Sequence, residues 1–279
     1  LSRCNGRRSS GKVESHPKTI HCELKVTLAN HFNEVMHLLL GGYAHRAITA
    51  EQLIQTIDLT LLDEQATVES LSQLKQNANL NRVAAICVYL QHLEQFSSQN
   101  TIPLATVINF PQGNDSLDSS LASIEKAMLL GVAEIDFVLP YQMYLQGQHQ
   151  KALNQCHAVS KLCKQHNLAL KIILETGAFP DMQTVYNVSN ELIELGCNFI
   201  KTSTGKIPVG ASLSAVFAIL SAIRDTQAEC GVKVSGGVKK PQDAYHYAIL
   251  AELIIKKQIN QSWFRIGASS LLDELLKII

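Results

Sequence analysis

Two lysines lie where short apolar segments run into turns rich in Gly, Ser and Thr. Lys201 stands in residues 198–206, which read NFIKTSTGK, and Lys233 stands in residues 232–237, which read VKVSGG. Burial at the edge of an apolar core disfavours the ammonium form of a lysine, and a second ammonium nearby lowers its pKa further. The free amine can then attack a carbonyl carbon and form a Schiff base. One such lysine alone would usually reach into water, but two, each before a turn suited to phosphate, favour catalysis.

Further charged residues interrupt the apolar segments. Asp136 lies within residues 133–139 and Lys171 within residues 168–174. Since a strand interior excludes unpaired charge, these two side chains and the two lysines above need one another as partners. Asp58, which closes the first apolar segment, and Cys87, near the end of the second, are expected beside them. A purely structural network of buried ions is the alternative, and the sequence leaves it open.

Two glycine-containing turns suggest a phosphate site. Gly236 and Gly237 follow one apolar segment and allow the backbone to approach an anion closely. Gly267, Ser269 and Ser270 follow the last apolar segment and lead into a helical pattern, whose N-terminus would favour negative charge. Either turn alone is weak support. Their adjacency in a barrel would make the combination more specific, because loops after the seventh and eighth strands often hold phosphate there.

Strands and helices are expected to alternate along the chain. Strands are expected at 57–60, 83–89, 104–109, 133–139, 168–174, 198–202, 231–235 and 263–266. Helices are expected near 29–40, 49–56, 67–78, 90–97, 117–130, 150–166, 182–195, 211–228, 241–255 and 269–278, and Thr49 with Gln52 has the spacing of a capping box. Continuous apolar strands suit a parallel sheet covered on both faces. Eight strand–helix units predict an α/β fold, a TIM (β/α)8 barrel with an N-terminal helical extension. The alternative is a doubly wound open sheet, but no dinucleotide fingerprint or P-loop occurs.

Composition limits the classes of partner and compartment. Of 279 residues, 46% are hydrophobic and 17% charged, which provides for a buried core. Lys and Arg equal Asp and Glu at 24 each, so no net charge favours nucleic acid or an anionic membrane. The seven cysteines include no C-x-x-C pair, so a reducing compartment, the cytoplasm, is expected. No apolar run approaches the roughly 18 residues of a membrane span.

The chain is expected to contain one folded domain. Residues 1–24 are rich in Arg, Ser and Gly without apolar periodicity, which predicts a disordered tail, with a transit peptide as the alternative. Residues 25–279 would form the barrel domain. The ten histidines show no H-x-x-x-H or H-E-x-x-H spacing, and His149, His157, His166 and His246 are interpreted as surface residues.

The motifs resemble those of the deoxyribose-phosphate aldolases, a family of class I aldolases on a TIM barrel. The similarity runs in order from about residue 46 to the C-terminus, and KTSTG at 201–205 is its most specific part. The other matching segments are 57–60 (IDLT), 85–89 (AICVY), 109–114 (NFPQGN), 134–138 (EIDFV), 171–177 (KIILETG), 199–206, 233–238 and 267–272.

The resemblance implies the reversible cleavage of 2-deoxy-D-ribose 5-phosphate to D-glyceraldehyde 3-phosphate and acetaldehyde, in deoxynucleoside and deoxyribose catabolism, without metal or cofactor. It implies that Lys201 forms the Schiff base and that Lys233 and Asp136 serve the proton transfers. The implied phosphate-binding residues are Gly205, Lys206, Gly236, Gly237, Gly267, Ser269 and Ser270, with Asp58, Cys87, Lys171 and Thr204 in support. The partner would be a small phosphorylated sugar, with no nucleic acid or membrane, and a homodimer stays open.

The sequence departs from the family pattern at both ends. Some members end in a tyrosine that reaches the active site, whereas the last tyrosine here is Tyr247, so proton transfer at the enamine is expected to be slower or assisted by water. Residues 1–45 have no clear counterpart, and a cap beneath the barrel and a partner surface are both open. Three other functions stay open: another class I aldolase or transaldolase-like enzyme, a sugar-phosphate isomerase, and a non-catalytic sugar-phosphate sensor.

Overall fold

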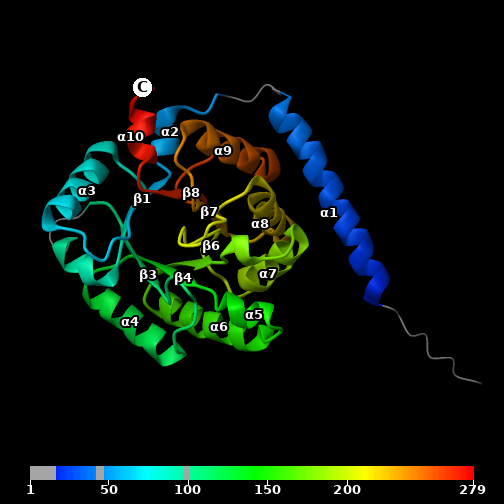
Figure 1. Cartoon of the computed structure of the whole chain (residues 1–279), viewed down its shortest axis with the longest axis horizontal. Coiled ribbons are helices and arrows are strands. Elements are labelled where there is room, and N and C mark those ends of the chain that lie inside the picture. The colour runs from blue at the N-terminus through cyan, green and yellow to red at the C-terminus, as the bar shows by residue number, and fades with distance from the viewer. Residues whose placement is uncertain (1–16, 42–46, 97–100) are drawn as a thin grey trace, which may run out of the picture.

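Eight short apolar segments pair side by side, all parallel, and the last pairs with the first, so the sheet closes into a barrel (Figure 1). The structure is a computed structural model, and it describes residues 17–41, 47–96 and 101–279. The strands are β1 Ile57–Leu61, β2 Ala85–Val88, β3 Leu104–Ile108, β4 Glu134–Val138, β5 Ala169–Ile173, β6 Phe199–Lys201, β7 Gly231–Ser235 and β8 Phe264–Ala268. The predicted TIM barrel is confirmed.

Helices connect the strands and form an outer ring. They are α1 Pro17–Leu40, α2 Ala50–Ile54, α3 Val68–Asn81, η1 Leu90–Phe96, α4 Leu117–Leu129, α5 Tyr141–Leu145, α6 His149–Gln165, η2 Thr176–Ala178, α7 Met182–Glu194, α8 Leu213–Thr226, α9 Pro241–Ile255 and α10 Leu271–Leu276. Thr49 and Gln52 form the expected capping box at α2. The helix expected after β2 is a 3₁₀ helix. The one-turn helix α5 is too short to show a periodic pattern, which is why the sequence did not reveal it.

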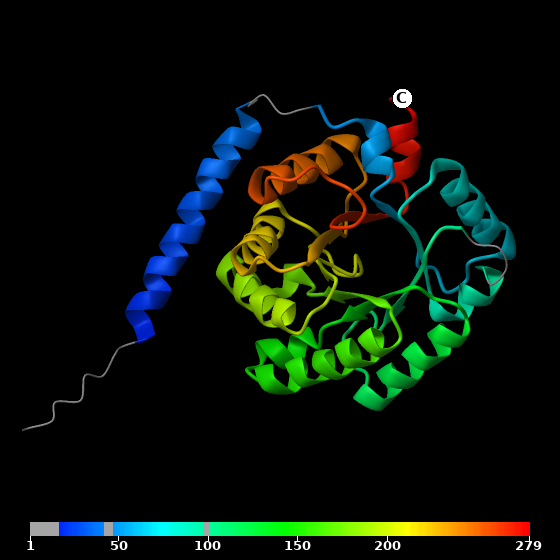
Figure 2. The ribbon, with the colours of Figure 1, turned by 180° about the vertical axis from the view of Figure 1, so that it is seen from behind.

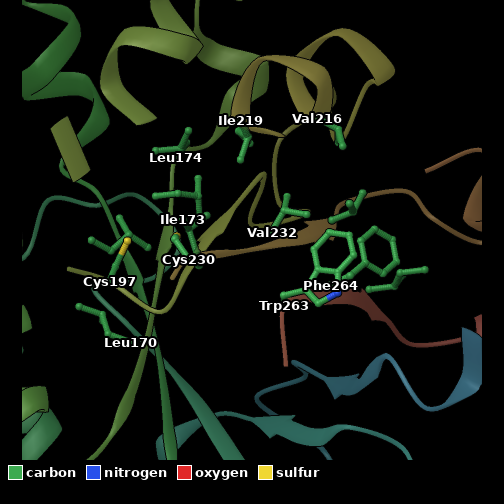
Figure 3. Packing of buried hydrophobic residues seen from close by; sticks show 14 of the residues in the cluster. Leu170, Ile173, Leu174, Cys197, Val216, Ile219, Cys230, Val232, Trp263 and Phe264 are labelled. Carbon is green, nitrogen blue, oxygen red and sulfur yellow. The ribbon is translucent and has the colours of Figure 1, made fainter. Parts of the chain in front are cut away.

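The core lies between the sheet and the helical ring. Figure 3 shows Val216 and Ile219 of α8 above Ile173 and Val232 of the sheet, and all four side chains are buried. The opposite face of α8 is also covered, because Phe217 packs against Phe32 of α1 with ring centroids 5.1 Å apart. A helix that is apolar on all sides is buried on all sides, and the run AVFAILSAI in α8 follows that rule.

Helix α1 lies outside the barrel, beside α8 and α9 (Figures 1 and 2). Val35 and Leu39 are buried, and His31 and Phe32 contact the ring of Phe217. Within the described part of the extension, α1 therefore adds to the helical ring at this side and does not lie beneath the barrel. The sequence predicted disorder for residues 1–24. Residues 17–24 instead form the first part of α1, which begins at Pro17. Residues 1–16 lie outside the described residues.

Candidate active site

Strand register brings the charged residues of β4 to β7 to neighbouring positions. Asp136 is the register partner of Lys171, and Lys201 is the partner of Lys233. Side chains alternate between the interior and the exterior of a barrel along each strand. All four side chains are buried, with exposed fractions of 0–3%. The charges therefore meet inside the barrel.

Asp136 is the common partner of the three lysines. Its Oδ2 lies 2.7 Å from the Nζ of Lys201 and 2.7 Å from the Nζ of Lys233. Its Oδ1 accepts a hydrogen bond from Lys171 at 2.8 Å. The prediction that these four residues have one another as partners is confirmed.

A second group of charges lies nearer the N-terminal ends of the strands. The guanidinium of Arg265 donates to Asp58 Oδ1 at 2.6 Å and to Glu134 Oε1 at 3.2 Å. Lys171 Nζ lies 2.5 Å from Glu134 Oε2, and Lys233 Nζ lies 2.6 Å from Asp58 Oδ2. Asp58 is the second residue of β1 and not its end, so it belongs to this lower group. Sequence reasoning missed Glu134 and Arg265 as site residues, although both are charges within apolar strands.

The environment gives the two strand-end lysines opposite shifts. Burial lowers the pKa of Lys201, and the attraction of Asp136 does not fully offset this effect. Burial opposes the charge of Lys233 too, but Asp136 and Asp58 outweigh it and raise its pKa. Burial also opposes the charge of Asp136, yet Lys171, Lys201 and Lys233 together hold its pKa well below the usual value. Lys201 therefore loses its proton more readily than Lys233 and is the lysine that more easily provides a free amine.

A cavity of about 330 Å³ opens above Lys201. It lies at the C-terminal ends of the strands. Seven of the residues predicted for the site line it together with Lys201: Thr204, Gly205, Lys206, Gly236, Gly237, Gly267 and Ser269. Ser270 does not line it; that residue occupies the N-cap position of the six-residue helix α10 without a side-chain cap hydrogen bond. Lys239 lines the same cavity and was missed, although it lies only two residues after Gly237.

The loop after β6 is held in place by hydrogen bonds on both sides. Thr204 donates from its hydroxyl to Glu175 Oε2 and from its backbone N–H to Glu175 Oε1, the latter at 3.3 Å. On the other side, Thr202 Oγ1 donates to the Ser235 carbonyl at 2.8 Å. Glu175 is buried, and burial raises its pKa. No role was predicted for Glu175 from the sequence, because its partner Thr204 lies at the end of another strand.

The Gly-Gly turn after β7 has a backbone that other residues rarely adopt. Gly236 and Gly237 have φ values of +93° and +87°. A Cβ at Gly236 would lie 3.0 Å from the Cβ of Ser203. Glycine therefore lets this turn pack against the loop after β6, and both turns border one cavity.

Cys87 and the histidines that the structure describes lie outside this group of charges. Cys87 is buried beside Ala105 and Val107, and burial raises the pKa of its thiol. Among the described residues, no three His, Cys, Asp or Glu side chains are grouped as metal ligands. His149, His157 and His166 are exposed, as expected, and His246 is half-buried. His92 is buried, however, with its Nε2 2.8 Å from the Asp63 carbonyl oxygen.

No helix of the described chain is both long and apolar enough to cross a membrane.

The closed barrel and the lysine at its open end are typical of (β/α)8-barrel enzymes that act on carbonyl groups. A closed parallel barrel carries an open cavity at the C-terminal ends of its strands, with a buried lysine at the cavity floor. Active sites of (β/α)8-barrel enzymes lie at this end, and a lysine with a lowered pKa loses its proton more readily and is suited to carbonyl chemistry.

Comparison with known proteins agrees with this class. Residues 44–277 match the sequence pattern described as DeoC/LacD family aldolase. The chain is 38% identical to a deoxyribose-phosphate aldolase of Agrobacterium fabrum over 233 residues, which cover 81% of this chain and 90% of the relative. The chain belongs to the DeoC/LacD family of aldolases.

Solved structures show the same fold. A Coccidioides immitis protein, provisionally named a deoxyribose-phosphate aldolase, superposes with a TM-score of 0.74 at 26% identity, covering 88% of this chain and 97% of that one. The deoxyribose phosphate aldolase of Aeropyrum pernix, described as a tetramer, gives a TM-score of 0.72 at 24% identity over the same shares of the two chains.

Proposed function

We propose that this aldolase reversibly cleaves 2-deoxy-D-ribose 5-phosphate to D-glyceraldehyde 3-phosphate and acetaldehyde, with Lys201 as the Schiff-base lysine. One observation carries the proposal: Lys201 lies on the floor of the cavity with its amine on Asp136, and burial lowers its pKa. The name of the Agrobacterium relative supports the choice of substrate.

The reaction begins at the aldehyde carbon of the open-chain sugar. The amine of Lys201 adds to this carbon, and loss of water gives an iminium. A base then removes the proton of the hydroxyl at C3, the C2–C3 bond breaks, and its electron pair enters the iminium to give an enamine. Glyceraldehyde 3-phosphate leaves at this point. Protonation of the enamine carbon and hydrolysis release acetaldehyde and restore Lys201.

Asp136 and Lys233 are the groups placed to move these protons. Because three ammonium groups hold its pKa low, Asp136 is a weak base on its own and would act through a water. Lys233 keeps its proton, since Asp58 and Asp136 raise its pKa, and it would supply that proton toward the enamine. Lys171 contacts Asp58, Glu134 and Asp136 and would hold these carboxylates in place.

The phosphate would bind in the outer part of the cavity. Lys206 and Lys239 line the cavity with exposed side chains, and the turns at Gly205, Gly236 and Gly237 have positive φ values. Backbone N–H groups in such turns can form an anion-binding concavity. Ser269 lines the same wall.

Trapping the covalent intermediate tests the proposal. The protein would be incubated with acetaldehyde and borohydride, and the modified peptide located by mass spectrometry. We expect one adduct, on Lys201, and loss of both trapping and turnover in Lys201→Leu with the fold retained. A Lys201→Leu variant with near-normal activity would refute the assignment. A transaldolase-like enzyme would be trapped by a ketose donor instead, and an isomerase or a sensor would not be trapped.

The context of the reaction is also proposed. The activity would serve deoxyribose catabolism in the cytoplasm, with residues 25–279 acting as one catalytic domain. A homodimer stays a prediction; the tetrameric aldolase of Aeropyrum pernix shows that this fold also forms larger assemblies.

A further inference from the structure

The charges inside the barrel do not balance if every group is ionised. Four cationic side chains and three carboxylates form one connected set of contacts; the cations are Lys171, Lys201, Lys233 and Arg265, and the anions Asp58, Glu134 and Asp136. All seven are buried. An unpaired charge in such a place is costly, and a group there tends to give up its charge. One cation of this set should therefore be neutral.

The contacts indicate which cation that is. Lys171 contacts three carboxylates, and Lys233 and Arg265 contact two each. Lys201 contacts only Asp136. Lys201 is also the one lysine of the three whose pKa is lowered. Neutral Lys201 leaves three cations facing three carboxylates.

Arg265 belongs to this balance but not to the substrate cavity. Its guanidinium bridges Asp58 and Glu134 and lies 5.3 Å from the ring centre of Phe199. It borders a separate cavity of about 650 Å³ at the N-terminal ends of the strands, and it does not line the cavity above Lys201. An effect of Arg265 on catalysis must therefore pass through other residues.

We propose that Arg265 keeps Lys201 unprotonated from the opposite end of the barrel. Arg265 supplies one positive charge to Asp58 and Glu134, so that Arg265, Lys171 and Lys233 together neutralise the three carboxylates, Asp136 included. The charge of Asp136 is then balanced without an ammonium group on Lys201. Arg265 is thus a positioning residue, and this inference rests on the proposed role of Lys201 as the Schiff-base lysine.

Other titratable groups near Lys201 stand outside this set of ion pairs. The thiol of Cys87 on β2 stays neutral because burial raises its pKa. Glu175, after β5, acts electrostatically on Lys201, but burial raises the pKa of its carboxyl group and so favours the neutral form. Asp63, Lys206 and Lys239 line the cavity with exposed side chains, whose charges are screened by water and salt. Strand β3 (LATVI) carries no titratable side chain.

Charge-removing variants test the proposal. Arg265→Met should move the acid limb of kcat/KM about one unit to higher pH and lower activity near neutral pH about tenfold, with recovery at alkaline pH. The pH at which acetaldehyde and borohydride trap Lys201 should move equally. Glu134→Gln alone should move the limb to lower pH. The double variant Arg265→Met/Glu134→Gln should return it close to its original position, and Arg265→Lys, which keeps the charge, should leave it there.

A merely structural role predicts a different pattern. Loss of activity that is equal at every pH in Arg265→Met, or a double variant worse than both single ones, would overturn the proposal. If Arg265→Met does not fold, as judged by circular dichroism, the Glu134→Gln variant decides: an unmoved acid limb would overturn it. Absence of trapping at Lys201 in the unaltered protein would instead refute the proposed function. Normal trapping with an unmoved limb would refute only the role of Arg265.

Discussion

Lys201 and Lys233 touch the same oxygen of Asp136, yet their surroundings favour different charge states. Lys233 is fully buried and also contacts Asp58, whereas Lys201 has Asp136 alone and borders the cavity. For Lys233, the additional contact with Asp58 outweighs the effect of burial and raises the pKa. Lys201 has no such second contact, and its pKa is lowered. At the scale of residues, the number of carboxylate partners thus separates the proposed nucleophile from its neighbour.

Lys233→Leu tests this separation. Removing the ammonium leaves Asp58 and Asp136 less neutralised, so they should favour an ammonium on Lys201 and raise its pKa toward about 10.4. We expect a large loss of kcat/KM near neutral pH that is partly recovered in alkaline solution. The measurement is the pH profile of kcat/KM. Residual activity that does not change with pH would show that Lys233 acts by proton transfer alone and that its charge does not set the pKa of Lys201.

At the scale of elements, two kinds of segment contribute separately. The turns after β6, β7 and β8 border the cavity, and the glycines of the β7 turn allow its close packing against the β6 loop. Helix α1 contributes apolar contacts on the far side of α8 and lines none of this cavity. The turns should therefore control substrate recognition, and α1 should affect stability alone.

Ser269→Asp tests the role of the β8 turn. A carboxylate in the cavity wall would repel the phosphate dianion, most strongly where water is partly excluded. We expect kcat/KM for 2-deoxyribose 5-phosphate to fall at least about tenfold, whereas kcat/KM for unphosphorylated 2-deoxyribose changes little. Both substrates would be assayed with the same preparation. Equal losses on the two substrates would mean that the turn is structural and that phosphate binds elsewhere.

Phe32→Ala tests the role of α1. Phe32 is half-buried against Phe217, so its truncation should cost about 1–2 kcal/mol of unfolding free energy, less than for a fully buried phenylalanine. The value would be read from urea unfolding, and kcat/KM should be unchanged. Asn33→Ala, at an exposed position of the same helix, is the matched control. A Phe32→Ala variant with lower kcat/KM but full stability would contradict this separation.

At the scale of the whole molecule, one set of ion pairs runs from Arg265 near the N-terminal ends of the strands to Lys201 beneath the cavity. The set contains residues from β1, β4, β5, β6, β7 and β8. Breaking a buried pair by removing one partner is strongly destabilising. The stability of the barrel and the charge of its proposed nucleophile therefore depend on the same contacts.

The stability of the whole chain should depend on pH in a defined direction. Burial opposes the charges of Asp58 and Asp136, but their cationic partners outweigh it and lower both pKa values. A carboxyl group with a lowered pKa stabilises the fold above its unfolded pKa of about 3.9, and this contribution is lost as the pH falls toward the folded value. We expect the unfolding free energy to fall below about pH 4, by up to about 1.4 kcal/mol per unit of pKa lowering.

Urea unfolding at a series of pH values measures this dependence. Glu125→Gln, which removes an exposed carboxylate on α4, should leave the acid slope nearly unchanged, because exposed charges contribute little. Asp58→Asn should be less stable near neutral pH and show a smaller slope in acid. An unfolding free energy of the unaltered protein that stays constant through the acid range would contradict the assignment of these carboxylates.

The order of the elements and most candidates for the site could be predicted from local sequence patterns. Alternating apolar and amphipathic segments are local patterns, so the eight strands and the capping box at Thr49 could be predicted from them. Lys201, Lys233 and Asp136 were recognisable because charge within an apolar strand requires a partner. A single turn of helix such as α5 has too few residues for a pattern, and α1 was predicted only in its C-terminal part.

Which charges pair, and which lysine has a lowered pKa, follows from the folded arrangement of the strands. Asp58 and Arg265 are 207 residues apart and meet only because β8 closes the barrel against β1. The balance between burial and attraction depends on how many carboxylates each lysine touches, and that number follows from strand register. The position of α1 beside α8 likewise depends on contacts between distant segments, such as Phe32 with Phe217. Local periodicity carries no information about such contacts.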